Sequence, residues 1–129
     1  MKIRILSILA LLFPVLAFAT APTCVVGKVG IAPAATLTFT APTTNTDGTP
    51  IATPLTYDLF EGTSPSTLYP VAKGLTGSPV TVNTGLKDGT TVYFDLTVVD
   101  AHGTMSAPSN VVCKMFPSAV PGTVTITIT

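Results

Sequence analysis

Tryptophan is absent from this 129-residue chain, histidine occurs once, cysteine occurs twice, and charged residues make up only 9% of the sequence. Two of the six basic residues, Lys2 and Arg4, lie at the extreme N-terminus, and the rest of the chain holds lysines but no arginine. A surface that binds nucleic acid through its phosphates requires clustered basic side chains, so we expect no nucleic-acid partner. Two cysteines and one histidine are too few for a closed zinc site, and we expect no metal and no cofactor.

Groups that perform catalysis are equally scarce. His102 is the sole imidazole, and although Asp100 precedes it by two positions, no Gly-x-Ser-x-Gly segment accompanies the pair. The acidic residues do not have the spacing of a calcium-binding loop. Asp47 is typical of a turn, and strand alternation predicts that Asp58 and Asp95 face outward into solvent. The sequence therefore predicts a protein that is not an enzyme.

The N-terminus has the composition of an export signal. A basic head is followed by an apolar run from Ile5 to Phe18 and by Ala17-Phe18-Ala19, which has small residues at the positions that signal peptidase reads. We predict a secretory signal peptide over residues 1–19 and a secreted, periplasmic or extracellular protein without a membrane span after cleavage. A membrane anchor is the alternative, but the run is shorter than the roughly 20 residues that a spanning helix needs. A lipid anchor on Cys24 is another alternative, although the preceding segment lacks the small residue of a lipobox.

The remaining chain has the length of one domain, and its clearest pattern lies at residues 91–100. Apolar side chains alternate there with Tyr93, Asp95 and Thr97, a period of two that is typical of a strand with one buried and one wet face. A strand this long must pack against a second layer. We expect it to be the central strand of a two-layer sandwich. The expected core residues are Phe39, Leu59, Phe94 and Leu96.

Six further segments have strand-like composition, and turn residues separate them at intervals of about 8–12 residues, as in all-β sandwiches. Pro70 places one of these strands at a sheet edge, because proline cannot donate to a central ladder. The sequence predicts a seven-stranded, all-β sandwich over residues 20–116. The six segments are residues 24–29, 35–41, 55–61, 67–73, 80–82 and 109–116.

Four motifs in this region, in this order and spacing, resemble the fibronectin type III domain of exported bacterial and phage proteins. They are Thr36-Leu-Thr-Phe-Thr-Ala-Pro42, Tyr57-Asp-Leu-Phe-Glu-Gly-Thr-Ser-Pro65, the pairs Gly85-Leu86 and Gly89-Thr90, and Ser106-Ala-Pro-Ser-Asn110. The resemblance covers residues 34–114 and implies an immunoglobulin-like sandwich. It also implies a binding role, because the loops at one end, here residues 42–54 and 100–106, form the variable surface of relatives.

The sequence departs from the family at two positions. Phe39 stands where the second strand of relatives usually carries a tryptophan, and Val92 stands at the position of the tyrosine that pins a corner of the fold. Tyr93 follows directly and is expected on the opposite face of its strand. We therefore expect the corner hydrogen bond of relatives to be missing. The Arg-Gly-Asp tripeptide of some animal members is absent too, so that activity is not implied.

Cys24 and Cys113 lie near the two ends of the expected mature chain. In an oxidising compartment the simplest arrangement is one disulfide within the chain. A bridge between two chains and a pair of buried thiols are the alternatives.

The last seven residues, 123–129, alternate threonine with valine or isoleucine and carry no charged side chain. Such a segment is able to pair with an exposed sheet edge, in its own domain or in a neighbour. A tail (residues 117–129) that packs locally or frays is the simpler interpretation. The residues proposed for strand addition are Thr123, Val124, Thr125, Ile126, Thr127 and Ile128.

Together these patterns predict a secreted, non-enzymatic binding or adhesion module that contacts another protein, a cell surface or a polysaccharide through its end loops. A structural subunit that self-associates through its C-terminal strand is the alternative function. The candidate binding-loop residues are Asn45, Thr46, Asp47, Asp100 and His102.

Overall fold

The computed structural model describes residues 21–122 and 124–128, and these form seven strands and no helix. The predicted signal peptide lies outside the described residues. No helix with the length and apolar character needed to cross a membrane occurs in the described part of the chain. The strands are β1 (Val25–Val26), β2 (Ala35–Leu37), β3 (Thr56–Ser64), β4 (Thr67–Leu75), β5 (Val80–Val82), β6 (Thr90–Val99) and β7 (Val112–Phe116).

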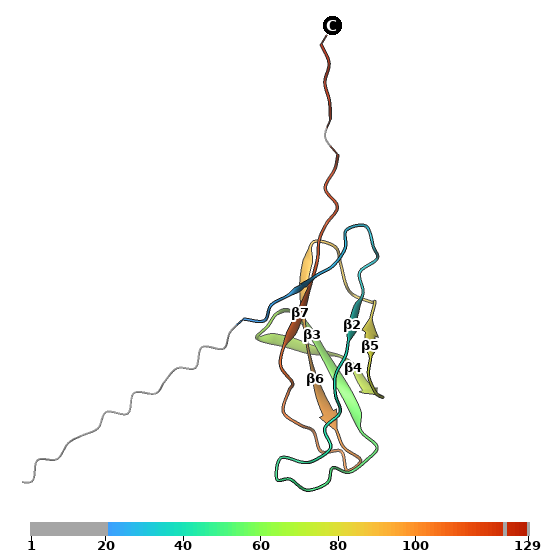
Figure 1. Cartoon of the computed structure of the whole chain (residues 1–129), viewed down its shortest axis with the longest axis vertical. Coiled ribbons are helices and arrows are strands. Elements are labelled where there is room, and N and C mark those ends of the chain that lie inside the picture. The colour runs from blue at the N-terminus through green and yellow to red at the C-terminus, as the bar shows by residue number, and fades with distance from the viewer. Residues whose placement is uncertain (1–20, 123, 129) are drawn as a thin grey trace, which may run out of the picture.

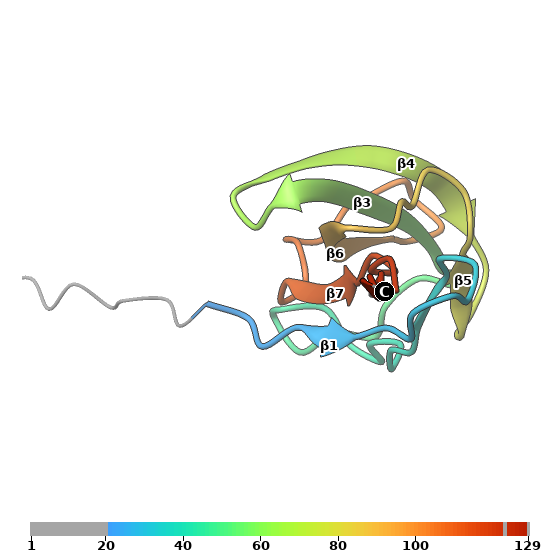
Figure 2. The same ribbon diagram turned by 90° about the horizontal axis from the view of Figure 1, so that it is seen from above.

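The strands form two facing layers (Figures 1 and 2). The larger sheet has the strand order β1-β7-β6-β3-β4, and the smaller sheet consists of β2 and β5. All pairs are antiparallel except β1 with β7. The predicted all-β sandwich is therefore confirmed, with β6 inside the larger sheet and β4, which contains Pro70, at its edge.

The core lies between the layers, on the faces that the alternation of β6 predicts. Leu59 and Phe94 are almost completely buried, and Ala35, Val82 and Phe116 pack with them. The two other residues expected in the core are only half-buried. Phe39 stacks obliquely on the ring of Tyr57, with centroids 4.5 Å apart, and Leu96 packs against the rim of the cluster. Both lie beside the groove described below.

The outer face of the larger sheet differs from the prediction at two positions. Asp58 and Thr97 point away from the core, as expected, but they are only 6% and 4% exposed rather than solvated. They are cross-strand partners on β3 and β6, and each of these strands has a paired neighbour on both sides. The Gly74 N–H on β4 donates to Asp58 Oδ1 at 3.0 Å. Flanking strands therefore cover side chains that a single alternating strand would leave in water.

Cys24 and Cys113 are joined in a disulfide within the chain, as predicted. The bond ties the residue directly before β1 to the second residue of β7. Cys113 is opposite Tyr93 in the ladder, whereas Val92 is buried on the core face. The displacement of the tyrosine to the outer face is therefore confirmed, and among the described residues the Tyr93 hydroxyl makes no hydrogen bond.

Candidate functional site

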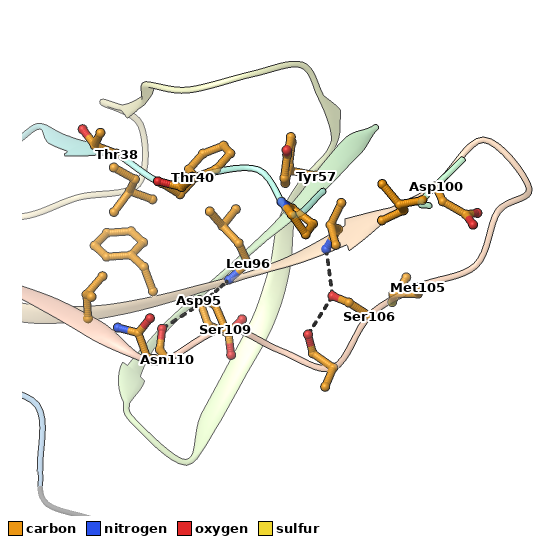
Figure 3. Close-up of a pocket in the computed structure, with 18 of the residues that line it drawn as sticks. Thr38, Thr40, Tyr57, Asp95, Leu96, Asp100, Met105, Ser106, Ser109 and Asn110 are labelled. Carbon is orange, nitrogen blue, oxygen red and sulfur yellow. Dashed lines mark hydrogen bonds between the residues drawn. The ribbon is translucent and has the colours of Figure 1, made fainter. Parts of the chain in front are cut away.

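A long open groove runs between the two layers on one side of the sandwich, and we call it the sandwich groove (Figure 3). One wall consists of β2 and the residues that follow it, and the other wall consists of β6 and the β6–β7 connection. Its volume is about 1090 Å³. Protein interiors are close-packed, and a space this large matches a binding pocket rather than a packing defect.

The groove exists because the two layers contain unequal numbers of strands. The smaller layer has only β2 and β5, whereas five strands lie opposite. On the side away from β5, β2 has no paired strand within the described chain. Apolar side chains of both layers are therefore only partly covered, and they form the groove floor. These side chains include Leu37, Phe39, Leu96 and Val98.

Two serine hydroxyls build the wall on the β6 side. Ser109 Oγ accepts a hydrogen bond from the Leu96 N–H at 3.1 Å, and the Ser109 N–H donates to the Leu96 carbonyl at 2.8 Å. Ser106 repeats this arrangement at Val98, with distances of 3.1 and 2.9 Å (Figure 3). β7 pairs with β6 only from Thr90 to Phe94, so the serines satisfy the backbone of β6 where that ladder has ended.

The two loops proposed for binding lie together at one end of the sandwich (Figure 1), and residues of both line the groove. The Ala101 N–H donates to the Ala52 carbonyl at 3.2 Å and joins them. Their candidate residues Asn45, Thr46, Asp47 and Asp100 line the groove, whereas His102 does not. The structure therefore brings four of the five candidates together.

Local turn geometry occupies most polar groups of the first loop. Asn45 Nδ2 donates to Thr49 Oγ1 at 3.0 Å and to the Pro50 carbonyl at 3.2 Å. Asp47 Oδ1 accepts from the Thr49 hydroxyl at 2.7 Å and from the Thr49 N–H at 3.0 Å. Both bonds lower the pKa of Asp47 below its usual value, and the bond from the hydroxyl has the larger effect. Gly48 has φ +84°, which the turn requires and which glycine adopts without strain.

The second loop is organised around the carboxylate of Asp100. Asp100 Oδ1 accepts hydrogen bonds from the backbone N–H of His102 at 2.9 Å and of Thr104 at 2.8 Å. The His102 residue is exposed, and its ring makes no hydrogen bond with another described residue. The structure therefore uses Asp100 to fix the loop and does not pair it with the imidazole as an acid–base couple.

Lys114 and β1 close the opposite end of the groove. Lys114 Nζ donates to the Ala34 carbonyl at 2.6 Å and lies 5.6 Å from the centre of the Phe116 ring. The lysine is half-buried, and both contacts stabilise its charge. The ammonium thus links β7 to the residue that precedes β2, and it holds the two layers together beside the groove.

Few titratable groups line the groove. Burial raises the pKa of Asp95, and its covered Oδ1 has no hydrogen-bond partner among the described residues. Within residues 21–122 and 124–128, no cluster of three or more histidine, cysteine or acidic residues has metal-binding geometry. The arrangement favours recognition of an apolar, extended segment, with the two loops as polar contacts at one end.

The C-terminal tail lies outside both sheets. Residues 117–122 and 124–128 continue beyond β7 and lead away from the sandwich (Figure 1). Val124, Ile126 and Ile128 are 88%, 84% and 92% exposed. The described tail residues are therefore a strand-forming sequence without a partner strand. Thr123, which the prediction also included, lies outside the described residues.

The sequence did not reveal the groove, although it contained one signal for the groove wall. Ser106 and Ser109 belong to a motif that suggested the family, but their bonds to β6 depend on where β7 begins. The lack of a neighbouring strand on one side of β2 depends on how the strands pair within the described chain, and no local pattern in residues 35–41 indicates it.

No protein-family model and no curated protein matches the chain. The chain is similar in structure to a Fn3-like protein from Clostridium thermocellum, known from its crystal structure. The TM-score is 0.52 at 22% sequence identity, and the alignment covers 79% of this chain and 100% of the other. With the strand order above, this similarity shows that the chain is a fibronectin type III-like β-sandwich, as its motifs predicted.

Proposed function

We infer that this protein is an exported, non-catalytic binding module that acts by holding another macromolecule in the sandwich groove and against the two loops at its end. The observation that carries this proposal is the open, largely apolar groove of about 1090 Å³. Exposed apolar surface of this extent is costly in water, and in soluble proteins it usually marks a contact site.

Three features support export and a role other than catalysis. The disulfide between Cys24 and Cys113 is the type of bond that forms in oxidising compartments. The apolar N-terminal segment ends in a signal-peptidase pattern. The carboxylates nearest the loop end, Asp47 and Asp100, are bonded to their own turns and are poorly placed to act as general bases.

An apolar dye tests whether the groove is an open binding surface. Anilinonaphthalene sulfonate is titrated into the ¹⁵N-labelled protein, and amide shifts are followed by NMR. We expect saturable shifts at Leu37, Leu96 and Val98, which line the groove, and none at Val71, which is exposed on β4. Absence of binding, or shifts confined to β4, would contradict the proposal.

A further inference from the structure

We propose that the sandwich groove is the acceptor for the C-terminal segment of a second copy of this chain, which adds residues 124–128 as a new strand beside β2. The inference rests on the proposed function, because it names the partner that the groove holds. Two features of the same molecule lack a partner strand among the described residues, and the inference rests on both. One is the edge of β2 beside the apolar groove, and the other is the alternating segment 124–128.

The backbone N–H and C=O groups of β2 and of the residues that follow it point alternately to the two edges of the strand. The Phe39 N–H donates to Ser78 Oγ at 3.0 Å, on the side where β5 lies. Because successive residues of an extended strand direct their N–H and C=O groups to opposite edges, those of Thr38 and its even-numbered neighbours face the groove. These groups form the ladder that an added strand requires.

The tail has the matching pattern. Its apolar side chains alternate with Thr125 and Thr127, so one face is apolar and the other carries the hydroxyl and methyl groups of threonine. Placed beside β2, the row Val124, Ile126 and Ile128 would point to the groove floor, where Leu37 and Leu96 are half-buried. The threonine row would face solvent, like the exposed Thr36 and Thr38. The tail carries no side-chain charge to desolvate.

The lengths also agree. The groove wall formed by β2 and the residues after it includes Thr36 to Thr40, which is as long as the segment 124–128. The tail continues the direction of β7 away from the body of the molecule (Figure 1). It is therefore presented to another copy rather than to its own groove. Donor and acceptor are different surfaces, so the contact is head-to-tail and gives closed rings or open chains.

The test places one charge on either face of the tail. Ile126→Asp puts a carboxylate into the row proposed to enter the groove, and the matched control Thr127→Asp puts it on the row proposed to face solvent. Sedimentation velocity is measured over a hundredfold range of protein concentration, on the full chain that remains after removal of the predicted signal peptide. We expect concentration-dependent association of the natural chain and of Thr127→Asp, and association at least tenfold weaker for Ile126→Asp.

A photo-crosslinking residue at position 126 locates the acceptor. In a mixture of ¹⁴N- and ¹⁵N-labelled chains, we expect crosslinks between copies that map to residues 36–40 and to Leu96. Crosslinks within one chain would show that the tail fills its own groove, and crosslinks to β4 would identify another edge. Either result, or a natural chain that stays monomeric throughout, overturns the proposal.

The dye separates the two proposals. If the groove binds dye but the chain is a monomer, self-association fails and the proposed function survives. If the groove binds neither dye nor tail, both fail. If both hold, Ile126→Asp binds more dye than the natural chain at high protein concentration, because its groove is vacant.

Discussion

The disulfide offers the most quantitative test of how this domain is stabilised. It joins residues 89 positions apart, Cys24 and Cys113, and so closes nearly the whole domain into one loop. The chain-entropy relation for a loop of about 90 residues gives about 4.6 kcal/mol of stabilisation at 25 °C. A domain of this size has a total free energy of unfolding of about 5–15 kcal/mol. The bond therefore contributes a large share of the stability.

The perturbation is the double substitution of both cysteines by alanine, measured by urea unfolding. With a slope of about 1.5 kcal/mol per molar, we expect the midpoint to fall by about 3 M. The amide of Gly27, which donates to the Met115 carbonyl at 2.7 Å, should also exchange faster, because β1 has only two residues and both are exposed. The reduced natural protein is the control and should match the variant. A midpoint shift below about 0.5 M would refute this reasoning.

Three further predictions concern the core, the β3–β4 hairpin and one carboxylate. Phe94→Ala should lower the free energy of unfolding by about 3–5 kcal/mol in urea titrations, because the ring is almost fully buried. The control Val71→Ala, at an exposed position of β4, should change it by less than about 0.5 kcal/mol. Similar effects of the two substitutions would contradict the assigned core. Gly62→Ala should lower the melting temperature by several degrees, because a Cβ there would collide with the Thr67 carbonyl oxygen; an unchanged melting temperature would show that the hairpin adjusts freely. Burial raises the pKa of Asp95, so its charged form costs stability above that pKa, and the cost disappears as pH falls through it. Asp95→Asn should therefore melt higher than the natural protein at pH 7 and close to it at pH 3; an equal difference at both pH values would point to another cause.

Much of the strand pattern could be predicted because it depends on near neighbours in the sequence. The alternation over residues 91–100 predicted β6, which spans Thr90–Val99. Pro70 predicted the edge position of β4, since a proline N–H is missing wherever the strand is placed. Local patterns of this kind contain the periodicity of a strand and the chemistry of its turns.

Burial on the outer face and the groove could not be predicted in the same way. Thr97 is polar and alternates with apolar residues, so its own strand indicates solvent, yet neighbouring strands cover it. Within the part of the chain that the structure describes, the Thr97 Oγ1 has no hydrogen-bond partner. The groove depends on a missing neighbour of β2, and Phe39 is half-exposed for the same reason. Both properties arise from which strands become adjacent. The candidate loop residues were found through family resemblance, and their convergence at one end follows from the fold.

The serine-lined wall has a consequence for solubility. After Phe94, β6 no longer pairs with β7, and backbone groups left unpaired along a strand are a template on which misfolded chains stack into aggregates. Ser106 and Ser109 satisfy its amide and carbonyl groups with hydroxyls and backbone from a connecting loop. Neighbouring molecules in a crowded solution therefore meet backbone groups of β6 that are already hydrogen-bonded. Self-association of the kind proposed above is therefore directed to the opposite wall of the groove, which β2 forms.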